Sequence, residues 1–510
     1  MAEAKLLTAE NVSRSVFWTV ARGVHAVVFA ILTTVVVVRM LGSSTYGEYA
    51  TAIAILTFAP ILYTLVLDQA LVRFVPELRV SGNTRGIRQL MRSVLAVQLG
   101  IWLLLVALAW FTRPLLNQFY SAEIGTVVFF GLLPYGLIAI NSVLTLVLIG
   151  HYDVKVPAIF AMLGTTFGLG ALCLLLAAGM GANGAVLTPA VPAAILLVVN
   201  IVRLRRLDLG DSGDGQAHEP VNPWRVIRFS APYFAAQILN TIIGTQSENV
   251  ALARYDTTTH TGFYNLGYTL PARLLSFIPL VVMNVAGISL NELYVSDRSR
   301  FYSAITTFYK MLFFLVAPLS LLGAAIARPA FVVLYGPEQS TAGTIAVIFF
   351  IAYSLGFLAM PFGFVERATE RTWISPVLAA PQAAFNIALI FILIPRFGLA
   401  GAVASGSVTL VVASLSTLWM WSRVFREVQI PWRYIAKCYA CASLFLLLLP
   451  IHAATGLSPL LLTGIGATGL LWLLAIRAVG LVGPEQARYL LRSGLPLRRL
   501  VTALIAPGVA

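Results

Sequence analysis

Charged residues are scarce in this chain. Only 11% of its 510 residues are Asp, Glu, Lys or Arg, whereas 59% are hydrophobic, and the mean hydropathy is +0.88. Soluble globular domains carry roughly a quarter of their residues charged, so the composition excludes that class. One membrane-crossing helix needs about 20 apolar residues. The chain is therefore long enough for a dozen or more spans, with little left over for a soluble domain.

Cysteine is also rare, and nucleotide-binding motifs are missing. Cys173, Cys438 and Cys441 all lie in apolar runs, so they do not form a disulfide framework. The last two have C-x-x-C spacing without a partner cluster of His or Cys, and we expect no metal site and no cofactor. A G-x-x-x-x-G-K-[ST] run is absent, which argues against ATP hydrolysis on this chain. No cleavable signal peptide is evident, because the first apolar run lacks an A-x-A-like site.

The formal net charge of +14 does not indicate a nucleic-acid partner, because the basic residues lie between apolar runs rather than on one patch. With the N-terminus in the cytoplasm, most of the 34 Lys and Arg residues fall on the cytoplasmic side. An even number of spans then places both termini inside. The apolar runs predict fourteen spans, near 14–38, 46–74, 90–112, 122–149, 157–179, 183–204, 226–253, 262–290, 303–327, 341–366, 374–395, 399–422, 434–452 and 457–480.

Several phrases recur in the two halves of the chain. TYGEY (45–49) pairs with TGFYN (261–265), and GANGAVLTPAV (181–191) pairs with GLAGAVASGSV (398–408) at nearly the same separation. Six predicted spans separate the copies, so the copies share one membrane orientation. Transporters are often built from two such halves. We therefore expect a parallel six-plus-six repeat with two further helices at the C-terminus.

The glycines and tyrosines of these phrases suggest outer-surface hairpins. We expect Gly47 and Gly262 at helix ends, where the chain reverses and adopts backbone angles that other residues resist. Tyr46 and Tyr264 are expected at the membrane interface with their hydroxyl groups outward. The predicted organisation is an N-lobe over 1–206, a cytoplasmic linker over 207–224, a C-lobe over 225–427, two spans over 428–482 and a cytoplasmic amphipathic tail over 483–510.

The segment LGSSTYGEYATAIAILTFAPILYTLVLDQALVRFVPEL (41–78) resembles the second-helix region of Wzx-type polysaccharide flippases. WRVIRFSAPYFAAQILNTI (224–242) is similar to the entry to their seventh helix. The repeat and the fourteen spans also fit the wider superfamily of MATE exporters and lipid II flippases. One departure is Glu248, where the family often carries Asp, and this weakens the transfer of a role to that position.

This resemblance implies an all-α polytopic membrane protein with two six-helix lobes in a MATE-like V-shaped architecture. It implies a transporter rather than an enzyme, with no catalytic residues. The implied substrate is an undecaprenyl-diphosphate-linked oligosaccharide, moved from the cytoplasmic to the outer leaflet of the bacterial inner membrane by alternating access. Implied partners are membrane lipids, a polysaccharide polymerase and assembly proteins, and a coupling ion, H⁺ or Na⁺.

Ionisable groups inside a span cost several kcal/mol unless they are paired or face water. Arg22 and Asp68 lie at similar depths in the first two spans, so they could form a structural ion pair or act in transport. Arg73 is expected to extend to the cytoplasmic interface as a structural residue. His25 could exchange protons, or it could be an ordinary interior histidine.

Arg273 lies between two prolines in the eighth span, where a guanidinium could hold a diphosphate by paired hydrogen bonds. The alternative is an ion pair with Glu248, which could also take part in proton coupling. Asn240, Gln246 and Asn386 add neutral polar groups, and we expect Arg22, Arg273, Asn240 and Gln246 to line the cavity.

Two other function classes remain open at this point. A small-molecule exporter of the MATE kind would use the same fold, although such exporters more usually have twelve spans. A membrane glycan polymerase or ligase would need a long outward loop with catalytic residues, and every predicted outward loop is short. A structural scaffold would not require arginines inside its spans.

Overall fold

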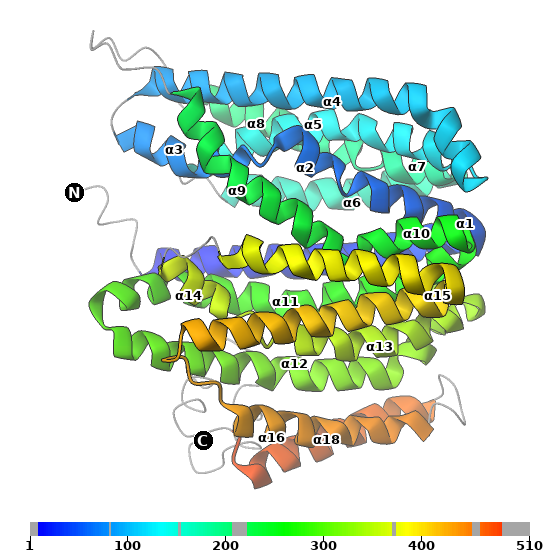
Figure 1. Ribbon diagram of the computed structural model, residues 1–510, viewed down its shortest axis with the longest axis vertical. Helices are drawn as coiled ribbons and strands as arrows, with labels where there is room; N and C mark the ends of the chain where they lie inside the picture. The colour runs from blue at the N-terminus through cyan, green and yellow to red at the C-terminus, as the bar shows by residue number, and fades with distance from the viewer. Residues whose placement is uncertain are drawn as a thin grey trace. The chain divides into compact units, whose positions relative to one another are not determined.

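The computed structural model describes residues 9–80, 83–150, 155–206, 222–369, 374–450 and 459–481. Over these ranges the chain is helical and contains no β-strand (Figure 1). Long apolar helices are the expected form in a bilayer, because each helix satisfies its backbone hydrogen bonds internally. The all-α membrane architecture predicted from the sequence is therefore confirmed.

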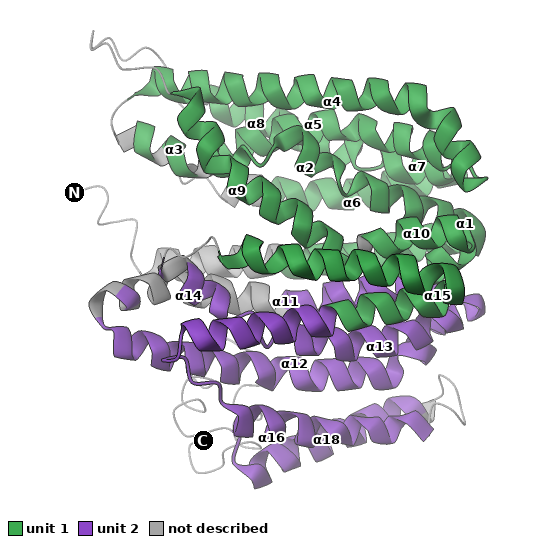
Figure 2. Ribbon diagram, in the orientation of Figure 1, with its two compact units in different colours: residues 1–265, 372–409 green, residues 266–371, 410–510 purple. Residues whose placement is uncertain are grey.

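The chain divides into two compact units, which Figure 2 colours separately. Unit 1 comprises residues 1–265 and 372–409, and unit 2 comprises residues 266–371 and 410–510. Two helices belong partly to each unit, α11 (Thr258–Ser296) and α15 (Ile374–Val424). The lobes drawn from the internal repeat remain a prediction.

In unit 1, α5 is the central helix and packs against α1, α3, α4, α7 and α8. Its sequence is apolar on all sides, as expected for a helix surrounded by others. The π-helix described below, Ile242–Gln246, and the break between α2 and α3 both belong to this unit. The elements of unit 1 are α1 (Ala9–Leu56), α2 (Ala59–Thr64), α3 (Asp68–Val80), α4 (Thr84–Tyr120), α5 (Ile124–Gly150), α6 (Lys155–Ala177), α7 (Gly181–Leu187), α8 (Ala190–Arg206), α9 (Pro223–Thr241), the π-helix η2 (Ile242–Gln246) and α10 (Ser247–Tyr255).

Two apolar clusters hold unit 1 together. One joins α3, α4 and α5 and includes Leu71, Ile87 and Val147, each at most 1% exposed. The other joins α1, α4, α5 and α7 around Leu56 and Ile124. Close packing rather than hydrophobic burial alone drives helix association inside a membrane, so these side chains set how the helices of unit 1 fit together.

Unit 2 is organised on α12, which packs against α13 and α16. Asp297 caps α12, because its Oδ1 accepts a hydrogen bond of 3.1 Å from the backbone N–H of Arg300. A third apolar cluster, which includes Cys438 and Cys441, joins α12, α16 and α18. The elements of unit 2 are α12 (Arg298–Tyr335), η3 (Pro337–Gln339), α13 (Ser340–Gly356), α14 (Phe362–Ala368), α16 (Trp432–Ala442), η4 (Ser443–Leu447) and α18 (Pro459–Val479).

Ten helical stretches of the described residues are long and apolar enough to cross a membrane. Two of them, Gly23–Thr64 and Ile374–Val424, each cover two of the predicted spans, so the ten together correspond to twelve of the fourteen. The predicted seventh and eighth spans fall on α9–α10 and on α11. The chain is therefore a multi-pass membrane protein.

Glycine makes the bends inside these two long stretches. Gly42 in α1 has φ 73° and Gly398 in α15 has φ 52°, in the left-handed region that glycine enters without steric cost. The chain changes direction at these two glycines, and the residues before and after each of them are helical. Each bend joins two predicted spans into a helical hairpin.

The predicted second span, 46–74, is broken twice. The chain leaves α1 just before Pro60, and it is interrupted again between α2 and α3. There Leu65 and Val66 both have positive φ, 46° and 55°. A β-branched residue in this region is uncommon. The break places Asp68 at the first position of α3.

The expectation for the tyrosines and glycines of the repeated phrases was wrong. Tyr46 is only 2% exposed, and its hydroxyl donates to Asn265 Oδ1 at 3.0 Å. Tyr264 is fully buried. Gly47 and Gly262 lie inside helices rather than at their ends, and they allow the two phrases to touch: a Cβ on Gly47 would overlap the carbonyl of Thr258. The two copies of the repeat are therefore packed against each other within unit 1.

Candidate functional site

The chain segment that leads to Glu248 begins with α9. Asn222 caps this helix by accepting a hydrogen bond of 2.9 Å from the backbone N–H of Trp224, and Pro223 occupies the first helical position. After Thr241 the helix widens into the π-helix Ile242–Gln246 before α10 begins at Ser247. Short π segments are rare and occur frequently at functional sites. Here the segment directly precedes a carboxylate inside a predicted span.

Glu248 is fully buried and lies against both arms of the α15 hairpin. Its Oε1 accepts a hydrogen bond of 2.6 Å from Asn386 Nδ2 and a longer one of 3.4 Å from Ser405 Oγ. Asn386 Nδ2 also donates to Thr409 Oγ1 at 3.0 Å. Asn386 precedes the bend at Gly398, whereas Ser405 and Thr409 follow it, four residues apart on one helix face. We call these four residues the Glu248 cluster.

The hydrogen bonding of the Glu248 cluster is incomplete. Glu248 Oε2 and Asn386 Oδ1 are both buried and accept no hydrogen bond. Glu248 forms no ion pair within the described residues. An ionised carboxylate in such surroundings is costly unless a positive charge compensates it. The geometry therefore suits the uptake of a proton, or of a small cation held by carboxylate, amide and hydroxyl oxygens.

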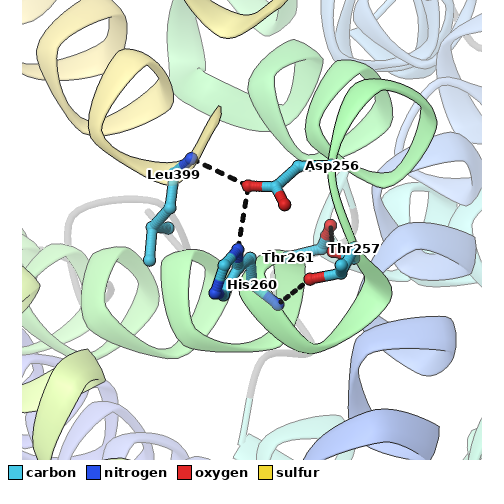
Figure 3. Close-up of polar contacts among 5 residues, drawn as sticks. All are labelled: Asp256, Thr257, His260, Thr261 and Leu399. Atoms are coloured by element: carbon cyan, nitrogen blue, oxygen red, sulfur yellow. Dashed lines mark hydrogen bonds and ion pairs between the residues drawn. The ribbon is translucent and has the colours of Figure 1, made fainter. Parts of the chain in front are cut away.

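A second polar arrangement joins the residue that follows α10 to the bend in α15 (Figure 3). Asp256 Oδ2 contacts His260 Nδ1 at 2.8 Å and accepts a hydrogen bond of 3.0 Å from the backbone N–H of Leu399. Gly398 leaves room for this carboxylate, because a Cβ there would overlap Asp256 Oδ2. Glu248 lies eight residues before Asp256, about 12 Å along a helix. The contact thus ties the end of α10 to the bend in α15.

Replacing Asp256 with Ala is expected to lower the thermal stability of the protein. The change leaves the backbone N–H of Leu399 without its acceptor and removes the partner of His260, at a cost of about 2 kcal/mol. The midpoint of thermal unfolding in detergent checks this. His260→Ala, which removes only one of the two contacts, should have a smaller effect. Equal midpoints for Asp256→Ala and the wild type would contradict it.

The other sequence-predicted residues are spread over both units. His25 contacts the hydroxyl groups of Thr166 and Thr165 on α6, at 3.3 and 3.4 Å, and stacks on Phe29 with ring centroids 4.1 Å apart. It therefore joins α1 to α6. Asp68 is half-buried, and its Oδ1 accepts no hydrogen bond. The side chain of Arg22 lies outside the described residues, so the predicted Arg22–Asp68 contact remains a prediction.

Arg73 lies in an exposed ion-pair network of unit 1. It contacts Glu77 at 3.5 Å, and Arg225 of α9 contacts the same carboxylate at 3.1 Å. The guanidinium of Arg225 also lies 4.8 Å from the ring centroid of Phe74. Exposed pairs of this kind contribute little stability individually. Arg73 thus takes part in a surface contact between α3 and α9.

The remaining cavity candidates differ in their surroundings. Arg273 is exposed on the unit 2 part of α11, whereas Glu248 belongs to unit 1. Asn240 is exposed on α9, and the side chain of Gln246 lies outside the described residues. No group of three or more His, Cys, Asp or Glu suited to a metal ion occurs among the residues that the structure describes.

Sequence reasoning identified Glu248 and Asn386 but not the groups that complete their surroundings. Ser405 and Thr409 lie in a stretch of small residues typical of any membrane helix, and nothing in that pattern marks them. Asp256 and His260 were passed over because they lie in a predicted outward loop. Their spacing of four residues at a helix start was the available signal.

Comparison with known proteins gives one family. A model described as "Polysaccharide biosynthesis protein" matches residues 12–287, more than half of the chain. No match was found among curated proteins. Among solved structures, a lipid II flippase, MurJ, in an inward closed conformation is similar over 95% of this chain and 100% of its own, with a TM-score of 0.70 and 13% identity.

MATE transporters have the same fold with lower similarity. The Vibrio cholerae transporter VcmN in its bent form covers 86% of this chain and 99% of its own, with a TM-score of 0.56 and 14% identity. An inward-facing multidrug resistance transporter of the MATE family and MOP superfamily covers 81% and 98%, with a TM-score of 0.55 and 13% identity. With the match over 12–287, the chain belongs to the polysaccharide biosynthesis protein family, and its fold is that of the lipid II flippase and the MATE transporters.

Proposed function

We propose that this protein is a flippase that moves an undecaprenyl-diphosphate-linked oligosaccharide across the bacterial inner membrane by alternating access. The observation that carries the proposal is the family match over 12–287 on a chain with the fold of a lipid II flippase. The product would serve the synthesis of a surface polysaccharide such as O-antigen, capsule or exopolysaccharide. Both termini would lie in the cytoplasm, as the distribution of basic residues favours.

The Glu248 cluster is the coupling site of this proposal. A fully buried carboxylate with one free oxygen gains most from a proton or a small cation. Neutralising Glu248, which lies on α10, would change the electrostatic cost of keeping its side chain buried against the two arms of α15. Because an ion shifts a conformational equilibrium only through different affinities for the two states, a site built on three helices is suited to this task.

Arg273 is proposed to hold the diphosphate. Its side chain is exposed on α11 although the residue lies within a predicted span. An exposed guanidinium at that depth is costly against lipid and favourable against water or a phosphate group. Arg22, in the first span, is also proposed to contact the substrate, and Asn240 and Gln246 are proposed to supply neutral contacts. A polymerase and assembly proteins would receive the flipped product.

Loss of the gene is expected to cause accumulation of lipid-linked glycan on the inner leaflet, because export of the intermediate stops while its synthesis continues. Wild-type protein should restore export, and Arg273→Ala should reduce it by about tenfold or more, as expected when a charge-assisted contact is removed. Glycan accessibility to an added protease-free glycosidase in inverted and right-side-out vesicles measures the distribution.

Arg396→Ala is the matched control, because Arg396 is exposed and its side chain forms no hydrogen bond, ion pair or ring contact in the described part of the chain. Unchanged surface polysaccharide and unchanged intermediates in the deletion strain, together with increased sensitivity to small organic cations, would contradict the flippase assignment. That result would favour an exporter of the MATE kind.

A further inference from the structure

The second half of α9 exposes an unusual set of side chains for a membrane span. From residue 231 to residue 241, its large apolar side chains are at least partly covered. Small or polar residues hold the most exposed positions instead. These positions are Ala231, Pro232, Tyr233, Ala235, Gln237 and Asn240.

A helix of the same unit shows the contrast. Large apolar side chains cover the exposed face of α4, which is therefore suited to lipid: Val97, Leu103, Leu104, Leu108, Phe111 and Leu115 are 41–76% exposed. Carboxamide groups facing hydrocarbon would lose their hydrogen bonds to water at a cost of several kcal/mol. The exposed face of α9 is thus suited to water or to a polar ligand, and not to lipid.

The polar residues share one face of the helix. Tyr233, Gln237 and Asn240 follow an i, i+4, i+7 spacing, which aligns them along about 10 Å. One and two turns before Tyr233, Ser230 and Val226 continue the same face but are buried, 2% and 6% exposed. The face is therefore covered where α9 begins, and it becomes open from Tyr233 onward.

The side chains on this face are uncharged, and their carboxamide groups have no hydrogen-bond partner in the described part of the chain. Within the described residues, the side chains of Gln237 and Asn240 make no hydrogen bond, and Tyr233 has only a ring contact with Phe229 at 5.5 Å. No Lys or Arg lies between Arg228 and Arg254 in the sequence. A phosphate would therefore find no compensating charge on the second half of this helix, beyond Arg228.

Neutral sugars fit this face better than phosphate does. Each carboxamide both donates and accepts hydrogen bonds, as pairs of sugar hydroxyl groups require. The ring of Tyr233 offers an apolar surface and a polar hydroxyl. We propose that Tyr233, Gln237 and Asn240 form a glycan-contacting face that binds the sugars of the lipid-linked substrate and selects among glycans. This inference rests on the proposed flippase function and adds to it the residues that recognise the sugar.

Binding of two probes to the purified full-length protein tests the inference. One probe is the lipid-linked oligosaccharide extracted from the deletion strain, and the other is undecaprenyl diphosphate without sugar. Gln237→Ala and Asn240→Ala are each expected to weaken binding of the first probe by about fivefold, since each removes a neutral hydrogen-bonding group. Binding of the second probe should be unchanged. Tyr233→Phe keeps the ring and should lose less affinity than Tyr233→Ala.

Gln118→Ala is the matched control, because it removes the same exposed carboxamide from the end of α4. Unchanged binding of the sugar-bearing probe, or equal loss for both probes, would overturn the glycan-contacting face while leaving the flippase function standing. If the wild-type protein bound neither probe, the proposed function itself would fail. Retained binding of undecaprenyl diphosphate shows that a variant is folded.

Discussion

Replacing Glu248 with Gln is expected to reduce export of the lipid-linked glycan strongly while leaving the protein folded. Gln has nearly the same shape, and its side-chain oxygen can still accept from Asn386 and Ser405. It cannot take up or release a proton, and it lacks the charge that attracts a cation. We expect export to fall by tenfold or more, measured by complementation of the deletion strain. The unfolding midpoint of the purified protein checks that the variant is folded.

Two further variants separate coupling from structure at this position. Glu248→Ala removes the acceptor as well and leaves Asn386 without its carboxylate partner, so it should also lower stability by about 2–3 kcal/mol. Glu427→Gln makes the same chemical change at an exposed glutamate and should export normally. Normal export by folded Glu248→Gln would remove Glu248 from the coupling mechanism.

Replacing Gly47 with Ala is expected to destabilise the protein by about 3 kcal/mol. The added methyl group would overlap the backbone carbonyl of Thr258, which cannot rotate away as a side chain can. The two repeated phrases would have to separate, and the hydrogen bond between Tyr46 and Asn265 would be strained or lost. Overpacking of this kind typically costs 1–3 kcal/mol and occasionally more. The midpoint of thermal unfolding measures it.

The glycines of the same chain provide a graded series of controls. A Cβ on Gly262 would lie 3.1–3.3 Å from Tyr46, Ser43 and Gly47, so Gly262→Ala should cost less than Gly47→Ala. Gly100 in α4 has open space around that position, and Ala is the better helix former. Gly100→Ala should therefore be neutral or slightly stabilising. An unfolding midpoint of Gly47→Ala equal to that of Gly100→Ala would contradict the packing explanation.

Much of the fold could be predicted because lipid imposes a simple rule on sequence. Long apolar runs must be helices in a bilayer, so the runs alone locate them. Helices cover most of the predicted second span, 46–74, but the apolar stretch ends at Thr64, and the interruption at Leu65 and Val66 was not foreseen. Neither residue is a usual turn former, so local preference does not account for their positive φ values.

Sequence reasoning singled out candidate site residues only where a residue type is rare within a membrane span. A glutamate within a span is rare enough to be noticed, and so is an arginine beside two prolines. Serines and threonines are common in membrane helices, so Ser405 and Thr409 carried no signal. Their importance depends on the bend at Gly398, which places them opposite Asn386 and next to Glu248.

By itself, the sequence determined that this protein is an all-helical multi-pass membrane protein in which several phrases recur, because hydropathy and recurring phrases are properties of the linear chain. Only the tertiary structure decided what the repeated phrases do. Tyr46, Gly47 and Gly262 resemble turn and interface residues, yet they form the contact between the two copies. The close approach of two helices depends on which of their faces pack together, and the order of residues along the chain does not show that pairing.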